Sequence, residues 1–412
     1  MSLSLFKTLR RQRMMPLLIL LQVALACAVL ANVLFLFQRQ LAPVLMDDGI
    51  AGDEVLLVDQ LISREGGWKR SQIQAGAEMI RALPGVRAVS PTLGLPMRQT
   101  MNLAFDVGSP AAGSVSVSGF AGEGLVKSLG LQLSQGRDFE SSDYQPIDLL
   151  ASTSSPFSEG SPVIITRALA NHLFPDGHAL GKSLSDGKEA KDRYRVVGIV
   201  DHLLRYQLSE LDDGKAEYSM LLPARVDGTP ILSYAVRVEP EQRQALVKQI
   251  REALNREFGN LQMAGIEIQV VEYDHLRDVS FKPRRAAAWL LGTVSLLITL
   301  ITLLGIASLT AYWVAQRTRQ IGIRRALGAT RGQILRHFLA ENLTVVVIGM
   351  VLGMPLALLG NQFLMSNYEL PRLPLQWLPI GGLALILIGQ LAVFGPARRA
   401  AAVPPAVATR SA

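Results

Sequence analysis

The sequence of 412 residues has little of what an enzyme or a metalloprotein uses for chemistry. Its single cysteine, Cys27, excludes a disulfide framework and any zinc site built on cysteine pairs. Its five histidines include no pair spaced as H-x-x-x-H, so that metal-binding motif is absent too. Charged residues make up only 18% of the chain, against about 25% in an average soluble domain. These shortages argue against an ordinary soluble protein and direct attention to the apolar residues.

The apolar residues are concentrated at the two ends of the chain in four stretches without a charged residue. A membrane-spanning helix needs roughly 20 apolar residues, and each stretch is long enough. We expect transmembrane helices at residues 14–38, 286–316, 342–363 and 377–395. The second would be about 46 Å long, which exceeds the hydrocarbon core, so it should tilt or project into water. The sequence therefore predicts a polytopic α-helical membrane protein.

The first apolar stretch follows four basic residues, an arrangement that also begins a signal peptide. Residues Ala24 to Cys27 resemble, imperfectly, a lipoprotein processing site. However, the apolar run continues to Phe37, beyond the 7–15 residues of a signal-peptide core. We therefore expect an uncleaved helix in which Cys27 is a small, buried packing residue.

Charge predicts the orientation. Residues 1–13, 317–337 and 396–412 carry 13 Lys or Arg and no Asp or Glu, whereas the rest of the chain has 28 basic and 34 acidic residues. The positive-inside rule places those three segments in the cytoplasm and leaves residues 39–285 outside. The basic excess is then a sign of membrane topology, and we expect no nucleic-acid partner.

The outer segment, residues 39–285, has the pattern of a large mixed α/β domain. Short runs typical of strands are residues 115–120, 163–166, 194–200, 231–238 and 266–271. Residues 71–83 and 240–258 have the apolar periodicity of helices. The expected fold is thus four transmembrane helices with a large extracytoplasmic α/β domain between the first and the second.

No segment predicts catalysis. Residues Gly177 to Ser183 resemble a phosphate-binding loop, but three residues separate the two glycines where the P-loop needs four. A glycine-containing turn is the better interpretation. No serine lies in a G-x-S-x-G context. We therefore expect no catalytic residue, no metal ligand and no cofactor on this chain.

The basic loop at residues 317–337 combines arginines with short apolar spacing and two glycines, Gly328 and Gly332. One interpretation is a basic interfacial helix on anionic membrane lipid. That interpretation explains the arginines, but it requires neither the glycines nor the apolar spacing.

From Arg317 to Gly353 the sequence resembles the FtsX-type permease module of MacB-like ABC transporters, whose loop reads R-x-x-E-I-G-I-R-R-A-L-G-A. The ending from Pro396 to Ala401 resembles the family's terminal P-A-R-R-A-A. Four further runs are similar to the MacB periplasmic core pattern: residues 129–139, 163–175, 180–182 and 196–200. One span, a large outer domain and three more spans is also the layout of that family.

This resemblance implies a permease subunit that exports a peptide, antibiotic or similar amphiphile from the periplasmic side by mechanotransmission. It assigns contact with an ABC ATPase to Gln320, Ile321, Gly322, Ile323, Arg324, Arg325, Leu327 and Gly328. Gln320 stands where the family usually has Glu, which removes one charge from that contact. Because the expected cytoplasmic segments are too short for a nucleotide-binding domain, we expect ATP and Mg on a separate ATPase chain.

Further partners implied by the resemblance are a second permease copy or a paralogue, and a periplasmic adaptor with an outer-membrane channel. The location implied is the cell inner membrane. Gly349, Gly353 and Gly360 in the third span would permit close helix packing, although glycine is common in membrane helices generally. Two alternatives stay open: a lipoprotein-releasing permease, and an FtsX-like regulator of an extracytoplasmic hydrolase that transports nothing.

Overall fold

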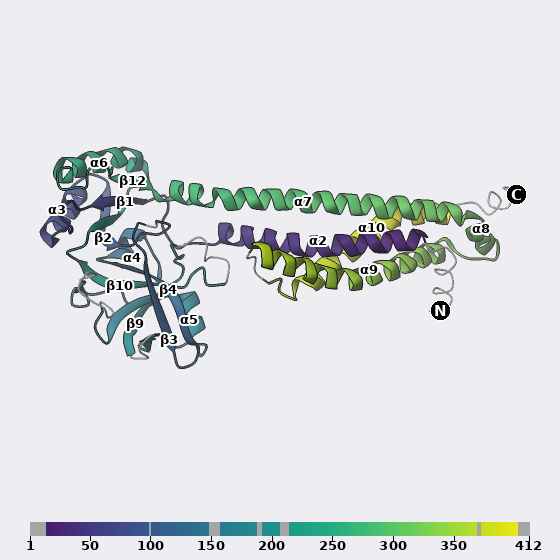
Figure 1. The fold of residues 1–412 in the computed structure, drawn as a ribbon, viewed down its shortest axis with the longest axis horizontal. Helices are drawn as coiled ribbons and strands as arrows, with labels where there is room; N and C mark the ends of the chain where they lie inside the picture. Colours follow the sequence, from purple (N-terminus) through teal and green to yellow (C-terminus); the bar gives the residue numbers. More distant parts are fainter. Residues whose placement is uncertain are drawn as a thin grey trace. The chain divides into compact units, whose positions relative to one another are not determined.

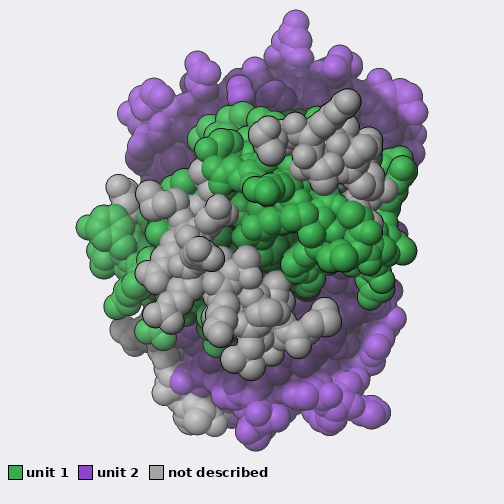
Figure 2. All heavy atoms as spheres, turned by 90° about the vertical axis from the view of Figure 1, so that its right-hand side faces the viewer, with its two compact units in different colours: residues 1–42, 284–412 green, residues 43–283 purple. Residues whose placement is uncertain are grey.

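The computed structural model describes residues 14–98, 100–147, 157–187, 192–206, 214–368 and 372–402 (Figure 1). The chain forms two compact units, coloured separately in Figure 2. One combines residues 1–42 with 284–412, and the other is residues 43–283. The expected cytoplasmic segment 1–13 and the last ten residues of the segment 396–412 lie outside the described residues.

Among the described residues, the first unit contains four helices that are long and apolar enough to cross a membrane. They are α2 (Met14–Leu45), α7 (Tyr273–Gln316), α9 (Arg331–Tyr368) and α10 (Trp377–Ala402), and the short α8 (Thr318–Ala326) follows α7. Ile19, Ile306, Val346 and Val393, one from each long helix, share a buried apolar cluster. We call these four helices the bundle, and they confirm the prediction of four apolar helices.

Each bundle helix extends beyond the apolar stretch that predicts it. Helix α7 has 44 residues and begins at Tyr273, well before residue 286. Tyr273 and Phe281 are buried among apolar residues of the second unit. Tertiary packing therefore stabilises the start of α7, which precedes the apolar run and could not be predicted from hydropathy. Helix α9 begins at Arg331, inside the segment expected to be a loop.

The second unit contains a mixed sheet of twelve strands. They are β1 (Val55–Ile62), β2 (Val86–Leu93), β3 (Leu103–Ser109), β4 (Gly113–Gly122), β5 (Leu133–Gly136), β6 (Gln145–Ile147), β7 (Ser161–Thr166), β8 (Ser183–Asp186), β9 (Asp192–Val200), β10 (Ser219–Val226), β11 (Ile231–Val238) and β12 (Gln269–Glu272). The helices that the structure describes in this unit are α3 (Arg70–Arg81), α4 (Leu125–Leu129), α5 (Arg167–Leu173), the 3₁₀ turn η2 (Pro240–Gln242) and α6 (Arg243–Phe258).

The sheet has two parts that share β4. Strands β12, β1, β11, β2 and β4 pair in that order, all antiparallel. Strands β4, β3, β8, β9, β7 and β10 form a closed ring, because β10 also pairs with β4 in parallel. Ring closure removes the free edges that an open sheet would leave in this half of the unit.

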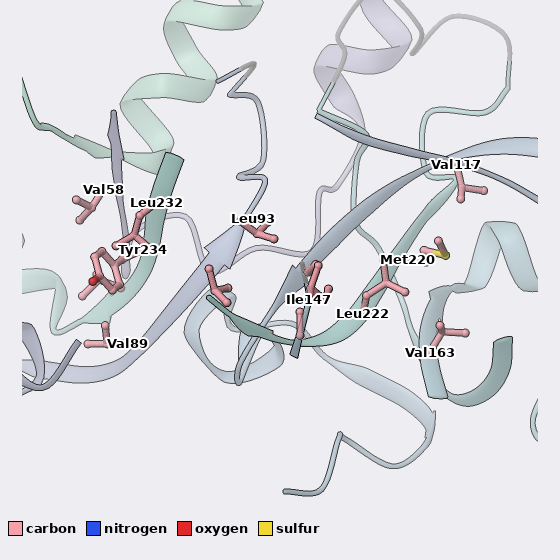
Figure 3. Packing of buried hydrophobic residues seen from close by; sticks show 14 of the residues in the cluster. Val58, Val89, Leu93, Val117, Ile147, Val163, Met220, Leu222, Leu232 and Tyr234 are labelled. Atoms are coloured by element: carbon pink, nitrogen blue, oxygen red, sulfur yellow. The ribbon is translucent and has the colours of Figure 1, made fainter. Parts of the chain in front are cut away.

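Successive side chains of β1 point to opposite faces of the sheet, and both faces of its open part are covered. Leu56 and Val58 belong to a cluster that includes apolar residues of α3 and α6. Val55 and Leu57 point the other way, into a cluster with residues of α4 and the start of α7. The first cluster continues into the ring, so that Val58 and Tyr234 of the open sheet and Met220 of the ring share one core (Figure 3).

Candidate functional site

The bend between α7 and α8 is fixed by a buried ion pair. Nη1 of Arg317 lies 3.1 Å from Oε1 and 3.4 Å from Oε2 of Glu341, which belongs to α9. Arg317 is 7% exposed and Glu341 is 1% exposed. The backbone also turns at Arg317, whose N–H donates to the carbonyl of Val314 and whose carbonyl accepts from the N–H of Ile321. This residue therefore joins α7, α8 and α9.

An aromatic contact holds the same guanidinium in place. Its central carbon lies 4.3 Å from the centroid of the Trp313 ring, within the range of a cation–π interaction. Trp313 in turn packs edge-on against Phe338 of α9, with ring centroids 6.5 Å apart. Arg317 is thus held by a carboxylate of α9 and by an indole that itself contacts α9.

Helix α8 has a buried side and an exposed side. Ile321 is 4% exposed and belongs to the apolar cluster of the bundle, and Gly322 beside it is also buried. Ile323 is 48% exposed, and Leu327, directly after the helix, is 83% exposed and donates its N–H to the carbonyl of Ile323. Arg324 is exposed between them. Two large apolar residues four positions apart lie near each other on the same side of a helix. Ile321 therefore packs into the bundle, and Gly322 is buried beside it.

The end of α8 and the start of α9 are both specified by local hydrogen bonds. Gly328 has φ +98°, a left-handed conformation that favours glycine, and the N–H of Ala329 donates back to the carbonyl of Arg324. The Thr330 hydroxyl then accepts from the N–H of Gln333, while the Gln333 side chain accepts from the N–H of Thr330. Gly328 is therefore the stop signal that makes α8 a separate short helix.

The surroundings of α8 are basic. Arg319, Arg324, Arg331 and Arg336 are all exposed, and residues 317–337 contain no Asp or Glu. Gln320 is exposed as well, whereas the side chain of Arg325 lies outside the described part of the structure. The exposed side of α8 therefore combines two apolar side chains with several positive charges.

The structure shows no arrangement for metal chemistry in the part of the chain it describes. Among those residues, no three His, Cys, Asp or Glu side chains could hold a metal ion together. In the segment that resembles a P-loop, Gly177 and Gly181 lie in turns with positive φ, and Lys182 Nζ is 2.5 Å from Oδ2 of Asp176. That lysine is paired within its own turn.

Two of the three glycines assigned to helix packing contact α2. A Cβ at Gly349 would lie 2.9 Å from Cγ1 of Val23, and one at Gly353 only 2.6 Å from Cβ of Cys27 and 2.7 Å from the carbonyl oxygen of Ala24. Gly360 differs, because a Cβ there would meet no atom of another element within 4 Å among the described residues. The described part of one copy therefore shows no close helix contact at Gly360.

Sequence reasoning missed the pair of Arg317 and Glu341. The two residues lie on different elements, and no spacing rule brings them together. A signal that sequence reasoning did not use is the T-x-x-Q pattern of Thr330 and Gln333, which marks the start of α9 but does not reveal the pair.

Family models match nearly all of the second unit and most of the bundle. A MacB-like periplasmic core domain matches residues 23–253, and an FtsX-like permease C-terminal domain matches residues 292–405. The first match alone covers more than half of the chain. The chain belongs to the MacB/FtsX-like ABC transporter permease family.

Named relatives are consistent with this family membership. A Paracoccus denitrificans "Macrolide export ATP-binding/permease protein MacB 1/2" is 27% identical over 311 residues, which are 74% of this chain and 42% of the relative. The "Uncharacterized ABC transporter permease YknZ" of Bacillus subtilis is 25% identical over 292 residues, 70% of this chain and 68% of the relative. This chain thus spans less than half the length of the Paracoccus protein.

A third relative and one solved structure are also similar to this chain. The Pseudomonas aeruginosa "Pyoverdine export ATP-binding/permease protein PvdT" is 27% identical over 225 residues, 53% of this chain and 33% of the relative. The crystal structure of the periplasmic region of MacB from Actinobacillus actinomycetemcomitans is 13% identical, with a TM-score of 0.36, and covers 57% of this chain and 97% of that one.

Proposed function

We propose that this chain is the permease subunit of a MacB-like ABC transporter that exports a peptide, antibiotic or similar amphiphile from the periplasmic side. Family membership supports the transporter class. Relatives named for macrolide export and for pyoverdine export support outward movement of a substrate. Both family matches fall on permease domains, and in this proposal ATP and Mg bind to a separate ATPase chain.

The observation that carries this proposal is the exposed side of α8. Ile323 and Leu327 are exposed while Ile321 anchors the helix in the bundle, and exposed arginines lie near the two apolar residues in the sequence. Protein interfaces combine an apolar centre with a polar rim, and this side of α8 has that composition. We propose that it docks on the ATPase.

The proposed orientation follows from the charge asymmetry. Helix α8 would lie in the cytoplasm with both termini, and unit 43–283 in the periplasm, with the bundle in the inner membrane. Reporter fusions at residues 150 and 330 test this directly. The reporter at residue 150 should be found outside the cell membrane, and the reporter at residue 330 should be found in the cytoplasm. The reverse pattern would refute the orientation and the docking proposal together.

The proposed mechanism is rigid-body motion of helices driven by ATP. Docking and hydrolysis would move α8, and the movement would pass to α7, which is one continuous helix from Tyr273 to Gln316. Residues of α7 belong to both compact units, so the same helix takes part in the bundle and in unit 43–283. A second permease copy or a paralogue would respond to the other half of an ATPase dimer.

Co-purification from the host tests the docking surface. Ile323→Asp and Leu327→Asp place a charge in the proposed contact and should reduce recovery of the ATPase subunit at least ten-fold, since losing a central apolar contact costs about 2 kcal/mol or more. Leu375→Asp is the matched control, because Leu375 is 71% exposed in the connection between α9 and α10. That variant should retain the ATPase.

Equal recovery with all three variants would refute docking through α8. Loss with Leu375→Asp as well would show that a surface charge anywhere on the chain disrupts the complex, and it would refute the specific contact in the same way.

A further inference from the structure

We propose that Arg317 and Glu341 act as a positioning pair that ties α8 rigidly to α7 and α9, so that a displacement of α8 moves the bundle. This inference rests on the proposed docking role of α8. The exposed surface of α8 would bind the ATPase, and Arg317 and Glu341 would transmit the resulting movement of α8 to the bundle.

Helix α8 needs such a tie because it has little stability of its own. It has nine residues, and isolated helices of fewer than about 12 residues are marginal in water. The backbone breaks at both ends, at the turn of Arg317 and at the left-handed Gly328. Its orientation must therefore come from side-chain contacts with the bundle.

The side-chain contacts of α8 differ in how strictly they fix position. Ile321 contributes apolar packing, which is non-directional. The Arg317 guanidinium is directional, because one nitrogen reaches both carboxylate oxygens of Glu341 and the plane of Trp313 lies 4.3 Å away. A push on α8 would therefore be transmitted through Arg317, where apolar contacts alone would allow it to slide.

A buried ion pair is also a poor choice for stability alone. Replacing both partners by apolar residues of similar size is often neutral or stabilising, whereas removing one partner leaves an unpaired buried charge. Replacing both residues by apolar ones therefore distinguishes a role in positioning from a role in stability. An apolar replacement of both residues should leave the bundle folded but free α8 from its fixed direction.

The test is a distance measurement on the full chain in lipid nanodiscs. Spin labels at Arg319→Cys in α8 and Arg336→Cys in α9 report the spread of their separation, and Cys27→Ala removes the one native thiol. The double variant Arg317→Met with Glu341→Leu should keep its thermal unfolding midpoint within a few degrees and broaden the distance distribution at least two-fold. If it does not fold, Glu341→Gln is measured in its place and should broaden the distribution likewise.

Asn342→Leu is the matched control. Asn342 follows Glu341 directly, is buried, and donates from Nδ2 to the carbonyl of Gly389 in α10, 3.2 Å away. Its loss disturbs the bundle at a neighbouring position but leaves the contacts of α8 intact, so the distribution should stay as narrow as in the native chain.

A second readout uses the ATPase. The double variant should still recover the ATPase at the native level, because Ile323, Arg324 and Leu327 are unchanged, but it should stimulate ATP turnover at least ten-fold less. A distribution as narrow as the native one, or native stimulation, would overturn the positioning role. A native chain that recovers no ATPase would instead refute the docking proposal, while the distance measurement would still decide what the pair does.

Discussion

Single side chains decide what α8 can do. Arg317 and Ile321 face the bundle and are almost completely buried, whereas Ile323 and Leu327 remain exposed. Substitutions on the two sides of the helix should therefore have different effects. Changes on the exposed side should weaken binding of the ATPase. Changes at Arg317 should weaken the coupling of α8 to the bundle.

The residue-scale prediction for unit 43–283 concerns pH. Nδ1 of His202 lies 2.5 Å from Oε1 of Glu217. This hydrogen bond raises the pKa of His202 above its ordinary value of about 6.5, partial burial opposes the rise, and the charges of Glu217, Asp47 and Asp201 add to it. Because the folded-state pKa is the higher one, the pair stabilises the fold below about pH 6.5 and loses that contribution as pH rises through the folded-state value.

Thermal unfolding of the native chain and of Glu217→Gln between pH 5 and 9 measures this effect. The difference in stability should be at most about 1 kcal/mol, because the His202 side chain is 44% exposed. It should be largest at acidic pH and should shrink toward pH 9. A difference that grows with pH would contradict the assignment.

At the scale of elements, helix packing depends on close approach at two glycines. A Cβ at Gly353 would meet the carbonyl oxygen of Ala24 at 2.7 Å, and a backbone atom cannot move aside cheaply. Gly353→Ala should therefore destabilise the bundle by about 1–3 kcal/mol. Gly360→Ala, on the same helix with open space around it, should be neutral or stabilising by up to about 1 kcal/mol. Equal effects in thermal unfolding would show that the α2–α9 contact is not this close.

Some elements were predictable from sequence and others were not, for physical reasons. The bundle helices were predictable, because a long apolar run without charged residues is typical of a membrane-spanning helix. Strand β11 was also predicted with its observed bounds, residues 231–238. Strand β1 was not, because the sheet is covered on both faces there and its residues do not alternate between apolar and polar. Strand β10 was not either, since Pro223 within it argues against a strand.

The candidate site divides in the same way. The residues of α8 could be predicted by resemblance, since they form a continuous motif. Which of them face the bundle could not, because the side of a nine-residue helix is set by packing against α7, α9 and α10. The Arg317–Glu341 pair depends on the tertiary fold alone.

At the scale of the whole molecule, two compact units are linked through long helices of a permease family. The bundle has the length and composition to cross a membrane, and unit 43–283 is a large α/β domain. In the proposed account, the chain acts as part of an assembly, because it passes movement from an ATPase to unit 43–283.

ATP turnover by the co-purified ATPase tests this account most directly, measured in nanodiscs with the native chain, with Leu327→Asp and with no permease. The account predicts that turnover depends on the native chain and that Leu327→Asp gives the rate seen without permease. Turnover that is the same in all three samples would contradict it.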